Sequence, residues 1–179
     1  MDTSQLPETR VAEMIAKVVT YFRQEGALYQ RASGPLAPVW KSSMRDHFSK
    51  PLLDAVKTIT LKGARIPPPP FYSEAVAMSA GHFPDFVHLA SVTYVDIIVF
   101  NDAIASRTLF HGLVHAQQIA SLGLENYAGL YLRGFLKTQW INIPLEAQAF
   151  QLEARFSMTP REVFSVEEEI NLWARDNRF

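Results

Sequence analysis

The chain has 179 residues, of which 48% are hydrophobic and 20% charged, and this predicts a soluble globular protein with a single domain over residues 1–179. With 17 basic and 18 acidic residues the formal net charge is −1, so we expect neither nucleic acid nor a membrane as a partner. The absence of cysteine excludes disulfides, iron–sulfur clusters, thiol catalysis and cysteine-based zinc sites, so any metal has to be held by His, Asp, Glu or water.

The amino-terminal residues 1–8 show no basic region followed by an apolar run, so they do not resemble a signal peptide. The apolar stretches of the chain are shorter than the roughly 20 residues that a membrane-spanning helix needs. We therefore expect the protein to be cytoplasmic. The composition does not choose between a small-molecule and a peptide partner, and it leaves the oligomeric state open.

The first predicted element is a helix over residues 8–31. Its start is suited by Pro7 and Glu8, and Gly26 could end it early. Apolar residues recur in it at helical spacing, with charged residues between them. These apolar residues are Val11, Met14, Ile15, Val18, Val19 and Phe22.

Two shorter helices are expected after the first one. Residues 33–38 contain a glycine and two prolines and therefore form a break. A second helical segment follows over about 40–48, and a short third one begins at Pro51. The expected amino-terminal helical region thus covers residues 8–56.

Residues 57–104 are expected to hold a small sheet and loops. The segment 58–61 is short, β-branched and alternating, which is typical of a strand. Residues 91–100 are dominated by β-branched and aromatic side chains and make the strongest strand prediction, which residues 101–102 close. We expect one sheet built from the segments near 58–65 and 91–100.

Four consecutive prolines occupy positions 67–70 between these two strands. They exclude a helix or a central strand and favour polyproline II. The segment is therefore either a stiff connector or a rigid wall that places Phe71 and Tyr72 beside a pocket.

A further helix is expected to begin close to Ser106 or Thr108, since either side chain could cap it. It runs to about Leu122, and Gly123 is a natural carboxy-terminal stop.

The remaining elements are also predicted to be helical. One helix covers about 125–138, and another begins at Pro144, which suits a first helical turn, and continues through Phe156. Pro160 breaks that helix, and a capping-box pattern opens a last helix over 165–174. The fold class is therefore α+β, mainly helical, with a small sheet beside the helices of residues 105–179.

Two histidines lie four residues apart on the helix that ends near Leu122. Because residues at i and i+4 share one helix face, His111 and His115 can bind a single metal ion. Metalloprotease helices of the His-Glu-x-x-His type carry a glutamate directly after the first histidine, where it acts as general base. Gly112 occupies that position, so the metal-binding part of the motif is present and the base is missing. Without a metal, the two histidines would form a hydrogen-bonded pair in the core.

Glu146 is the best candidate for a third ligand. It lies in the first turn of the helix that begins at Pro144, among small and apolar residues, where a carboxylate usually has a partner. Glu153, seven residues further along a similar face, either supports the ligands from behind or is the true ligand. Packing in the core or on the surface is expected instead for the other histidines, His47, His82 and His88.

The motifs resemble those of a zincin-like family of small, single-domain bacterial metal-dependent hydrolases, which are similar to the His-Glu-x-x-His metalloproteases. The shared features are an apolar strand ending in Asp, the helix pattern Leu-Phe-His-Glu-Leu-Val-His-x-x-Gln, a Leu-Gly pair, a tyrosine-rich helix and the pattern Ile-Pro-Leu-Glu-x-x-Ala-Phe/Tyr. They are found here at Asp96, 109–118, 122–123, Tyr127 with Tyr131, and 143–150. The likeness extends from the prolines near position 67 to the end of the chain.

The resemblance implies a Zn2+ ion, or another divalent metal, held by His111, His115 and Glu146 with water completing the shell. In the relatives the motif glutamate would take the proton of that water as it attacks a carbonyl. Gly112 has no side chain and cannot do so, and a glycine costs a helix interior roughly 1 kcal/mol relative to alanine. Its presence fits natural degeneration, space for a bulky ligand, or an engineered substitution.

Three functions follow as hypotheses. The first is a zincin-like metal-binding protein whose hydrolysis is lost or strongly reduced. The second is an active metal-dependent hydrolase with its base supplied by Glu153, Asp96 or Asp102 and with Tyr131 as electrophile. The third is a protein that binds no metal and uses its aromatic residues, 12% of the chain, for binding or assembly.

Overall fold

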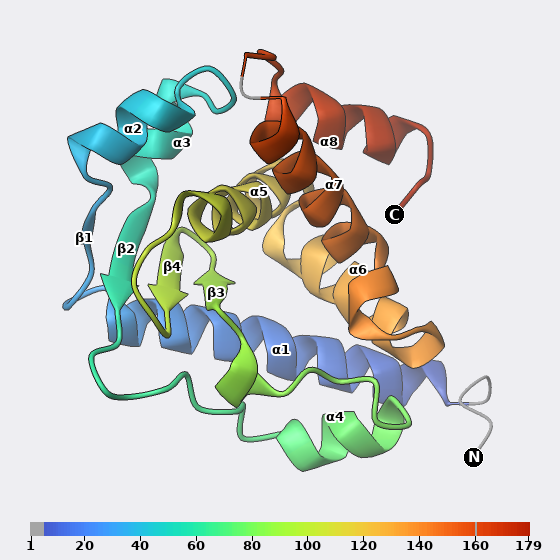
Figure 1. The fold of residues 1–179 in the computed structure, drawn as a ribbon. Helices are drawn as coiled ribbons and strands as arrows, with labels where there is room; N and C mark the ends of the chain where they lie inside the picture. The colour runs from blue at the N-terminus through green and yellow to red at the C-terminus, as the bar shows by residue number, and fades with distance from the viewer. Residues whose placement is uncertain (1–5, 160) are drawn as a thin grey trace.

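The computed structural model describes residues 6–159 and 161–179 and shows a small mixed sheet flanked by helices (Figure 1). The strands are β1 (Gly34–Pro35), β2 (Lys57–Thr60), β3 (Ser91–Tyr94) and β4 (Ile97–Phe100). The α-helices are α1 (Glu8–Tyr29), α2 (Pro38–Met44), α3 (Lys50–Ala55), α4 (Tyr72–Met78), α5 (Ser106–Leu122), α6 (Leu124–Lys137), α7 (Pro144–Met158) and α8 (Val166–Arg175). The short 3-10 helices are η2 (Phe86–His88) and η3 (Trp140–Asn142). The predicted α+β class, mainly helical with a small sheet, is confirmed.

The sheet has the strand order β1-β2-β4-β3. β2 and β4 run parallel, whereas β1 is antiparallel to β2 and β3 is antiparallel to β4. Ile98 of β4 pairs with Thr58 on one side and with Thr93 on the other. β4 is therefore an inner strand, and all four of its residues are buried.

The prediction of one continuous strand over residues 91–100 is wrong. β3 and β4 form a hairpin, and the two residues between them, Val95 and Asp96, make the turn. Val95 has a φ of 60°, in the left-handed region that β-branched residues rarely adopt. Hairpin turns are usually signalled by Gly or Asn, and because this segment contains neither, its sequence reads as an unbroken strand.

The segments between the first helix and the hairpin also differ from the prediction. Gly34 and Pro35, within the predicted break over 33–38, form a short strand that pairs with β2 at the sheet edge, where proline is tolerated. The prolines at 67–70 lie outside helices and strands, as expected, but a helix that was not predicted, α4, begins at Tyr72 directly after them.

Two predicted helix starts are confirmed, one of them with its cap. α5 begins at Ser106, but its N-cap is Ala105, so neither Ser106 nor Thr108 is the capping residue. The hydroxyl of Thr108, at the third helical position, accepts from the N–H of Ala105 at 3.3 Å and donates to the C=O of Ala105 at 3.0 Å. At the start of α8, the hydroxyl of Ser165 accepts from the N–H of Glu168 at 3.3 Å, as the capping-box pattern predicts.

The helix ends follow the prediction at one glycine and depart from it at another. Gly123 ends α5 with a φ of 80°, a conformation that glycine adopts without strain. Gly26 does not end α1, which continues to Tyr29. The predicted break at Pro160 lies outside the described residues.

Helices α1 and α5 cover opposite faces of the sheet (Figure 1). Ile97 and Val99 belong to the apolar cluster that contains Tyr21 of α1, whereas Ile98 and Phe100 belong to the cluster of α5. α1 also packs along α6, and α5 packs along α7. Among the described residues, no helix combines the length and apolar character needed to cross a membrane.

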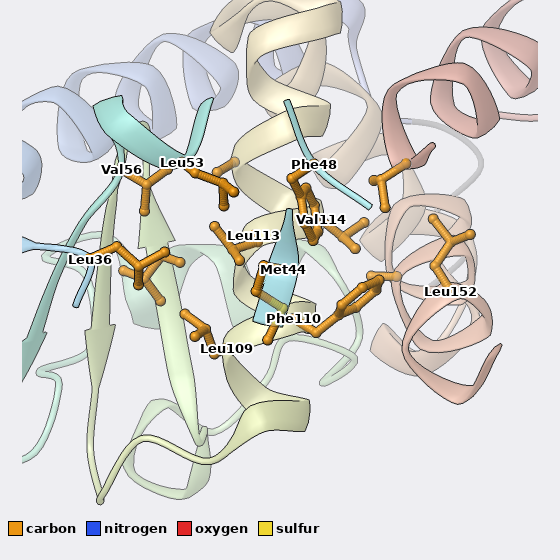
Figure 2. Close-up of a cluster of buried hydrophobic side chains, with 14 of the residues drawn as sticks. Leu36, Met44, Phe48, Leu53, Val56, Leu109, Phe110, Leu113, Val114 and Leu152 are labelled. Carbon is orange, nitrogen blue, oxygen red and sulfur yellow. The ribbon is translucent and has the colours of Figure 1, made fainter. Parts of the chain in front are cut away.

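A large apolar cluster surrounds α5 on the side of α2 and α3 (Figure 2). Its labelled members are Leu36, Met44, Phe48, Leu53, Val56, Leu109, Phe110, Leu113, Val114 and Leu152. Because α5 is clamped between this cluster, the sheet and α7, the polar residues on its remaining face have fixed positions.

Candidate metal centre

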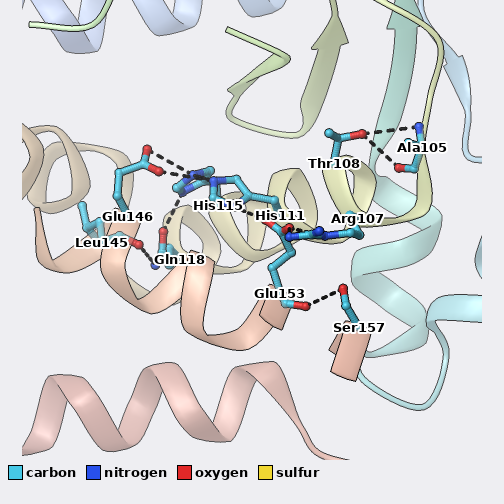
Figure 3. A network of polar contacts seen from close by, with 10 residues as sticks. All are labelled: Ala105, Arg107, Thr108, His111, His115, Gln118, Leu145, Glu146, Glu153 and Ser157. Atoms are coloured by element: carbon cyan, nitrogen blue, oxygen red, sulfur yellow. Dashed lines mark hydrogen bonds and ion pairs between the residues drawn. The ribbon is translucent and has the colours of Figure 1, made fainter. Parts of the chain in front are cut away.

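Helices α5 and α7 bring two imidazoles and a carboxylate to one point (Figure 3). His111 and His115 project from α5, and Glu146 projects from the first turn of α7. The Nε2 atoms of the two histidines are 3.0 Å apart, and the carboxylate oxygens of Glu146 lie 3.3 Å from Nε2 of His111 and 3.4 Å from Nε2 of His115. One ligand atom from each residue lies within 4.8 Å of the others. The structure thus places the three candidate ligands together.

The hydrogen bonds of Gln118 decide which nitrogen of His115 carries a hydrogen. Nε2 of Gln118 donates to the C=O of Leu145 at 2.9 Å and to Oε1 of Gln148 at 3.0 Å. The amide of Gln118 therefore turns its oxygen to Nδ1 of His115, at 2.9 Å. This acceptor requires a hydrogen on Nδ1, so Nε2 of a neutral His115 directs a lone pair into the cluster.

The carboxylate of Glu153 determines in the same way which nitrogen of His111 carries a hydrogen. Its Oε2 lies 3.1 Å from Nδ1 of His111, while its Oε1 accepts from Nε of Arg107 at 2.8 Å. Nδ1 of His111 therefore donates to the carboxylate, and Nε2 is left to face His115 and Glu146. The structure places Glu153 on the Nδ1 side of His111, a position that fits the supporting role of the two that the sequence left open.

When both imidazoles are neutral, three acceptor groups therefore converge on one point. Oε2 of Glu146 is buried and, among the described residues, has no partner with hydrogen-bond geometry despite its 3.3 Å distance from His111. Two lone pairs and a carboxylate repel one another unless a proton or a metal cation lies between them. Two imidazoles and one carboxylate are also a ligand set of catalytic zinc sites, in which a fourth position stays open. The residues present fit a divalent metal.

The close approach of carboxylates and imidazoles also shifts the pKa values of the residues in the cluster. Burial alone would lower the pKa of His111, but the nearby carboxylates of Glu146 and Glu153 outweigh burial and raise it to about 9. Burial would raise the pKa of Glu146, but the charge of His115 and the neighbouring imidazole of His111 bring it down to about 2. The pKa of Glu153 is also lowered: burial opposes the shift, and His111 and Arg107 outweigh burial. Both carboxylates are therefore ionised, and their charge is balanced by a proton on His111 or by a metal cation.

Gly112, at the position of the missing base, faces the sheet. A Cβ at this residue would lie 2.9 Å from Cγ2 of Ile98 and 3.4 Å from Oγ1 of Thr93. The hydroxyl of Thr93 also donates to the C=O of Gly112 at 3.0 Å. Residues of β3 and β4 thus fill the space next to Gly112, and the glycine allows α5 to approach the sheet closely. This arrangement does not support the interpretation that Gly112 makes room for a bulky ligand.

The other candidates for a base or an electrophile lie at different places. Asp96 is exposed in the turn between β3 and β4, and Asp102 is exposed and pairs with Arg65 at 3.0 Å. Neither aspartate lines the pocket that contains the three candidate ligands. Tyr131 does line it, with its ring centroid 6.3 Å from that of His115.

The candidate ligands line a pocket of about 120 Å³ whose walls are mainly apolar. The walls come from α1, α6, β3 and the loops around α4. The aromatic members are Tyr21, Phe22, Phe71, Phe83, Phe86, Tyr127, Tyr131, Phe135 and Trp140. Pro69 and Phe71 belong to the wall whereas Tyr72 does not, so the proline segment contributes to a pocket wall, one of its two predicted roles.

The remaining histidines lie away from the cluster. His47 is buried beside the C=O of Phe164, at 3.3 Å, and His82 lies 3.4 Å from the C=O of Phe135. His88 is exposed on η2. Their positions agree with the predicted packing roles.

Sequence reasoning missed the residues that orient the ligands. Gln118 follows His115 by three positions and Arg107 precedes His111 by four, so helical spacing could have identified both. Thr93 lies on a different element from Gly112, and no local pattern signals that contact.

Comparison of the chain with protein-family models, with curated proteins and with solved structures finds no match. The resemblance to zincin-like hydrolases therefore depends on the motifs alone.

Proposed function

We propose that this protein is a zincin-like metal-binding protein, related to zinc-dependent hydrolases and peptidases, whose own hydrolysis is lost or strongly impaired. Zn2+, or another divalent ion, is held by His111, His115 and Glu146. When bound, such an ion polarises a carbonyl oxygen and lowers the pKa of water. The observation that carries the proposal is the convergence of two imidazole Nε2 atoms with a buried carboxylate that has an unpartnered oxygen.

The residues behind the ligands support this proposal. Glu153 accepts from Nδ1 of His111 and is itself held by Arg107, and Gln118 accepts from Nδ1 of His115. These contacts select the tautomer in which both Nε2 atoms are ligands, and they hold both rings in place before a metal arrives. Little conformational entropy remains to be lost on binding, which favours tight metal binding.

The residues that line the pocket support metal binding more strongly than hydrolysis of a substrate. Among the described residues that line it, Glu146 is the only carboxylate, and as a ligand it is not free to take a proton. Gly112 has no group that could replace the missing base. Tyr131 reaches the pocket but offers a hydroxyl, which suits an electrophile better than a base. The observations therefore favour an impaired hydrolase over an active one.

The alternative function is that of a binding protein that holds no metal. In it a proton on His111 would bridge the cluster, as the raised pKa of this residue permits, and the pocket would serve binding alone. Metal content separates the two functions.

The test is elemental analysis of protein purified without chelator, then dialysed against Zn2+. We expect about one equivalent of metal, since the three ligands form one site. Glu146→Gln keeps the size of the side chain and removes its charge, so the metal should be lost. His88→Gln changes an exposed histidine outside the cluster and serves as the matched control. Metal content below about a tenth of an equivalent in the unmodified protein would refute the proposal.

A panel of peptides and esters tests the second part of the proposal. With Zn2+ bound, we expect turnover no faster than that of the Glu146→Gln variant under the same conditions. Turnover that requires both the metal and Tyr131, shown by its loss in Tyr131→Phe, would establish an active hydrolase instead.

A further inference from the structure

The pocket beside the metal cluster is apolar almost everywhere else. Besides His111, His115 and Glu146, its lining consists of aromatic and aliphatic side chains, prolines and the hydroxyl groups of Ser91, Thr93 and tyrosines. The described residues of the lining include no lysine and no arginine. A charged ligand in this pocket could therefore be neutralised only at the cluster.

The net charge of the metal-loaded cluster determines which ligand charge would make the site neutral. A divalent cation bound to two neutral imidazoles and the carboxylate of Glu146 leaves a net charge of about +1. Glu153 does not change this sum, because it is paired with Arg107 at 2.8 Å. A monoanion would leave the buried site neutral, and neutrality matters here because an uncompensated charge in an apolar pocket is costly.

The volume of the pocket limits the rest of the ligand. The pocket measures about 120 Å³, and an apolar cavity of roughly 150 Å³ is large enough to bind benzene. Because the pocket is slightly smaller than that cavity, one ring or a branched chain of similar size is the upper limit for an apolar body that enters without rearrangement. Phe83 and Phe135, whose centroids are 4.7 Å apart, and Trp140 give this body aromatic neighbours in the wall.

From these observations we infer that the site binds a small monocarboxylate, with its carboxylate at the metal and an apolar body the size of a single ring in the aromatic pocket. The inference rests on the proposed metal site and names the ligand class of that site. It requires no hydrolysis, and it accounts for a pocket that is retained beside a cluster without a base.

The test uses phenylacetate as the probe and isothermal titration of the protein loaded with Zn2+. Two partial probes separate the contributions: 2-phenylethanol keeps the ring without the charge, and acetate keeps the charge without the ring. We expect 2-phenylethanol to bind at least about tenfold more weakly than phenylacetate, and acetate about 10- to 100-fold more weakly. Metal-free protein should lose at least about tenfold in affinity for phenylacetate. With Co2+ in place of Zn2+, phenylacetate should change the visible absorption of the metal.

A size-selectivity variant tests the position of the ring. Phe135→Leu enlarges the pocket, so we expect a preference for 2-naphthylacetate over phenylacetate that the unmodified protein lacks. Phe48→Leu is the matched control, because Phe48 is equally buried, at 4% exposure, but belongs to the cluster around α5 and does not line the pocket. A loss of stability common to both variants cannot produce a change of preference in one of them.

The outcomes separate this inference from the proposed function. If no metal is bound, the proposed function fails, and the inference fails with it. If metal binds fully but phenylacetate binds equally well without metal, or no better than 2-phenylethanol, only the inference is overturned. An unchanged preference in Phe135→Leu would overturn the placement of the ring.

Discussion

Gly112 on α5 lies so close to Ile98 on β4 that a Cβ at position 112 would be 2.9 Å from Cγ2 of the isoleucine. This distance is shorter than two carbon atoms tolerate, and Cγ2 is attached directly to the Cβ of Ile98, so it cannot easily move away. The absence of a side chain at position 112 therefore has a packing role as well as a chemical consequence.

Gly112→Ala should destabilise the protein. The gain in helix propensity, roughly 1 kcal/mol, is outweighed by an overpacking cost of about 1–3 kcal/mol, which leaves a net loss of up to about 2 kcal/mol. In an Ile98→Ala background the contact is absent, and the same change should stabilise by up to about 1 kcal/mol. Urea unfolding of the four proteins of this double-mutant cycle measures the effect. Equal effects of Gly112→Ala in both backgrounds would contradict it.

Gly112→Glu should not restore hydrolysis by itself. The first carbon of the new side chain points at Ile98 and Thr93, so the carboxylate can reach the metal only if α5 or the sheet shifts. We expect a stability loss without turnover of peptides or esters. Turnover by this single variant, measured with Zn2+ present and at unchanged stability, would show that the sheet yields to the side chain.

Glu153→Gln should weaken metal binding without removing a ligand. The change takes away the charge that holds Nδ1 of His111, and the loss of such a supporting contact typically costs about 10–100-fold in metal affinity. Competition with a coloured zinc chelator measures the affinity. Glu162→Gln is the control, because Glu162 pairs with Arg155 on α7, away from the cluster. Equal affinities of the two variants would mean that Glu153 does not support the site.

Metal removal should lower the thermal stability of the protein. A metal present at about 100 times its dissociation constant stabilises the folded state by about 2.7 kcal/mol, which corresponds to a rise of about 5–10 °C in Tm for a chain of this size. His115→Gln should abolish the difference between zinc-loaded and chelator-treated protein. His82→Gln, which changes a histidine outside the cluster, should keep it. Scanning calorimetry with and without chelator decides between these outcomes.

The buried His47 should make the protein less stable in mild acid. Burial lowers the pKa of His47, although its hydrogen bond to the C=O of Phe164 opposes the shift, as do the charges of Asp46 and Glu162, while Arg155 favours it. The unfolded chain therefore takes up a proton at this residue more readily than the folded protein does. The contribution of neutral His47 is present above the unfolded pKa of about 6.5 and is lost as the pH falls below it.

His47→Asn retains an N–H group near the carbonyl of Phe164 and removes the titration. The stability difference between the unmodified protein and this variant should therefore shrink between about pH 7.5 and pH 5. Urea unfolding at several pH values measures the difference. A difference that stays constant over this range would show that His47 titrates alike in both states.

Local patterns in the sequence were enough to predict the helices that carry the candidate ligands. The periodic apolar residues, Gly123 at the end of α5 and the serine cap of α8 all act within one or two helical turns. The spacing of His111 and His115 fixes their common helix face for the same reason. Glu146 could be proposed as their partner because a carboxylate among apolar residues needs one.

The hairpin of β3 and β4 shows where local patterns fail. β4 is buried along its whole length and therefore forms an apolar run without alternation, and Val95 occupies a turn position that the sequence does not mark. Only pairing with the neighbouring strands fixes this turn.

Local patterns within a few helical turns thus predict the main helices, the class of the fold and the nature of each candidate ligand. Packing between distant segments places Glu153 behind His111, Ile98 in the space beside Gly112, and aromatic residues of α1 and α6 around the cluster. These contacts join segments far apart in the chain, and their distances follow from how whole helices pack on the sheet, which no local pattern specifies.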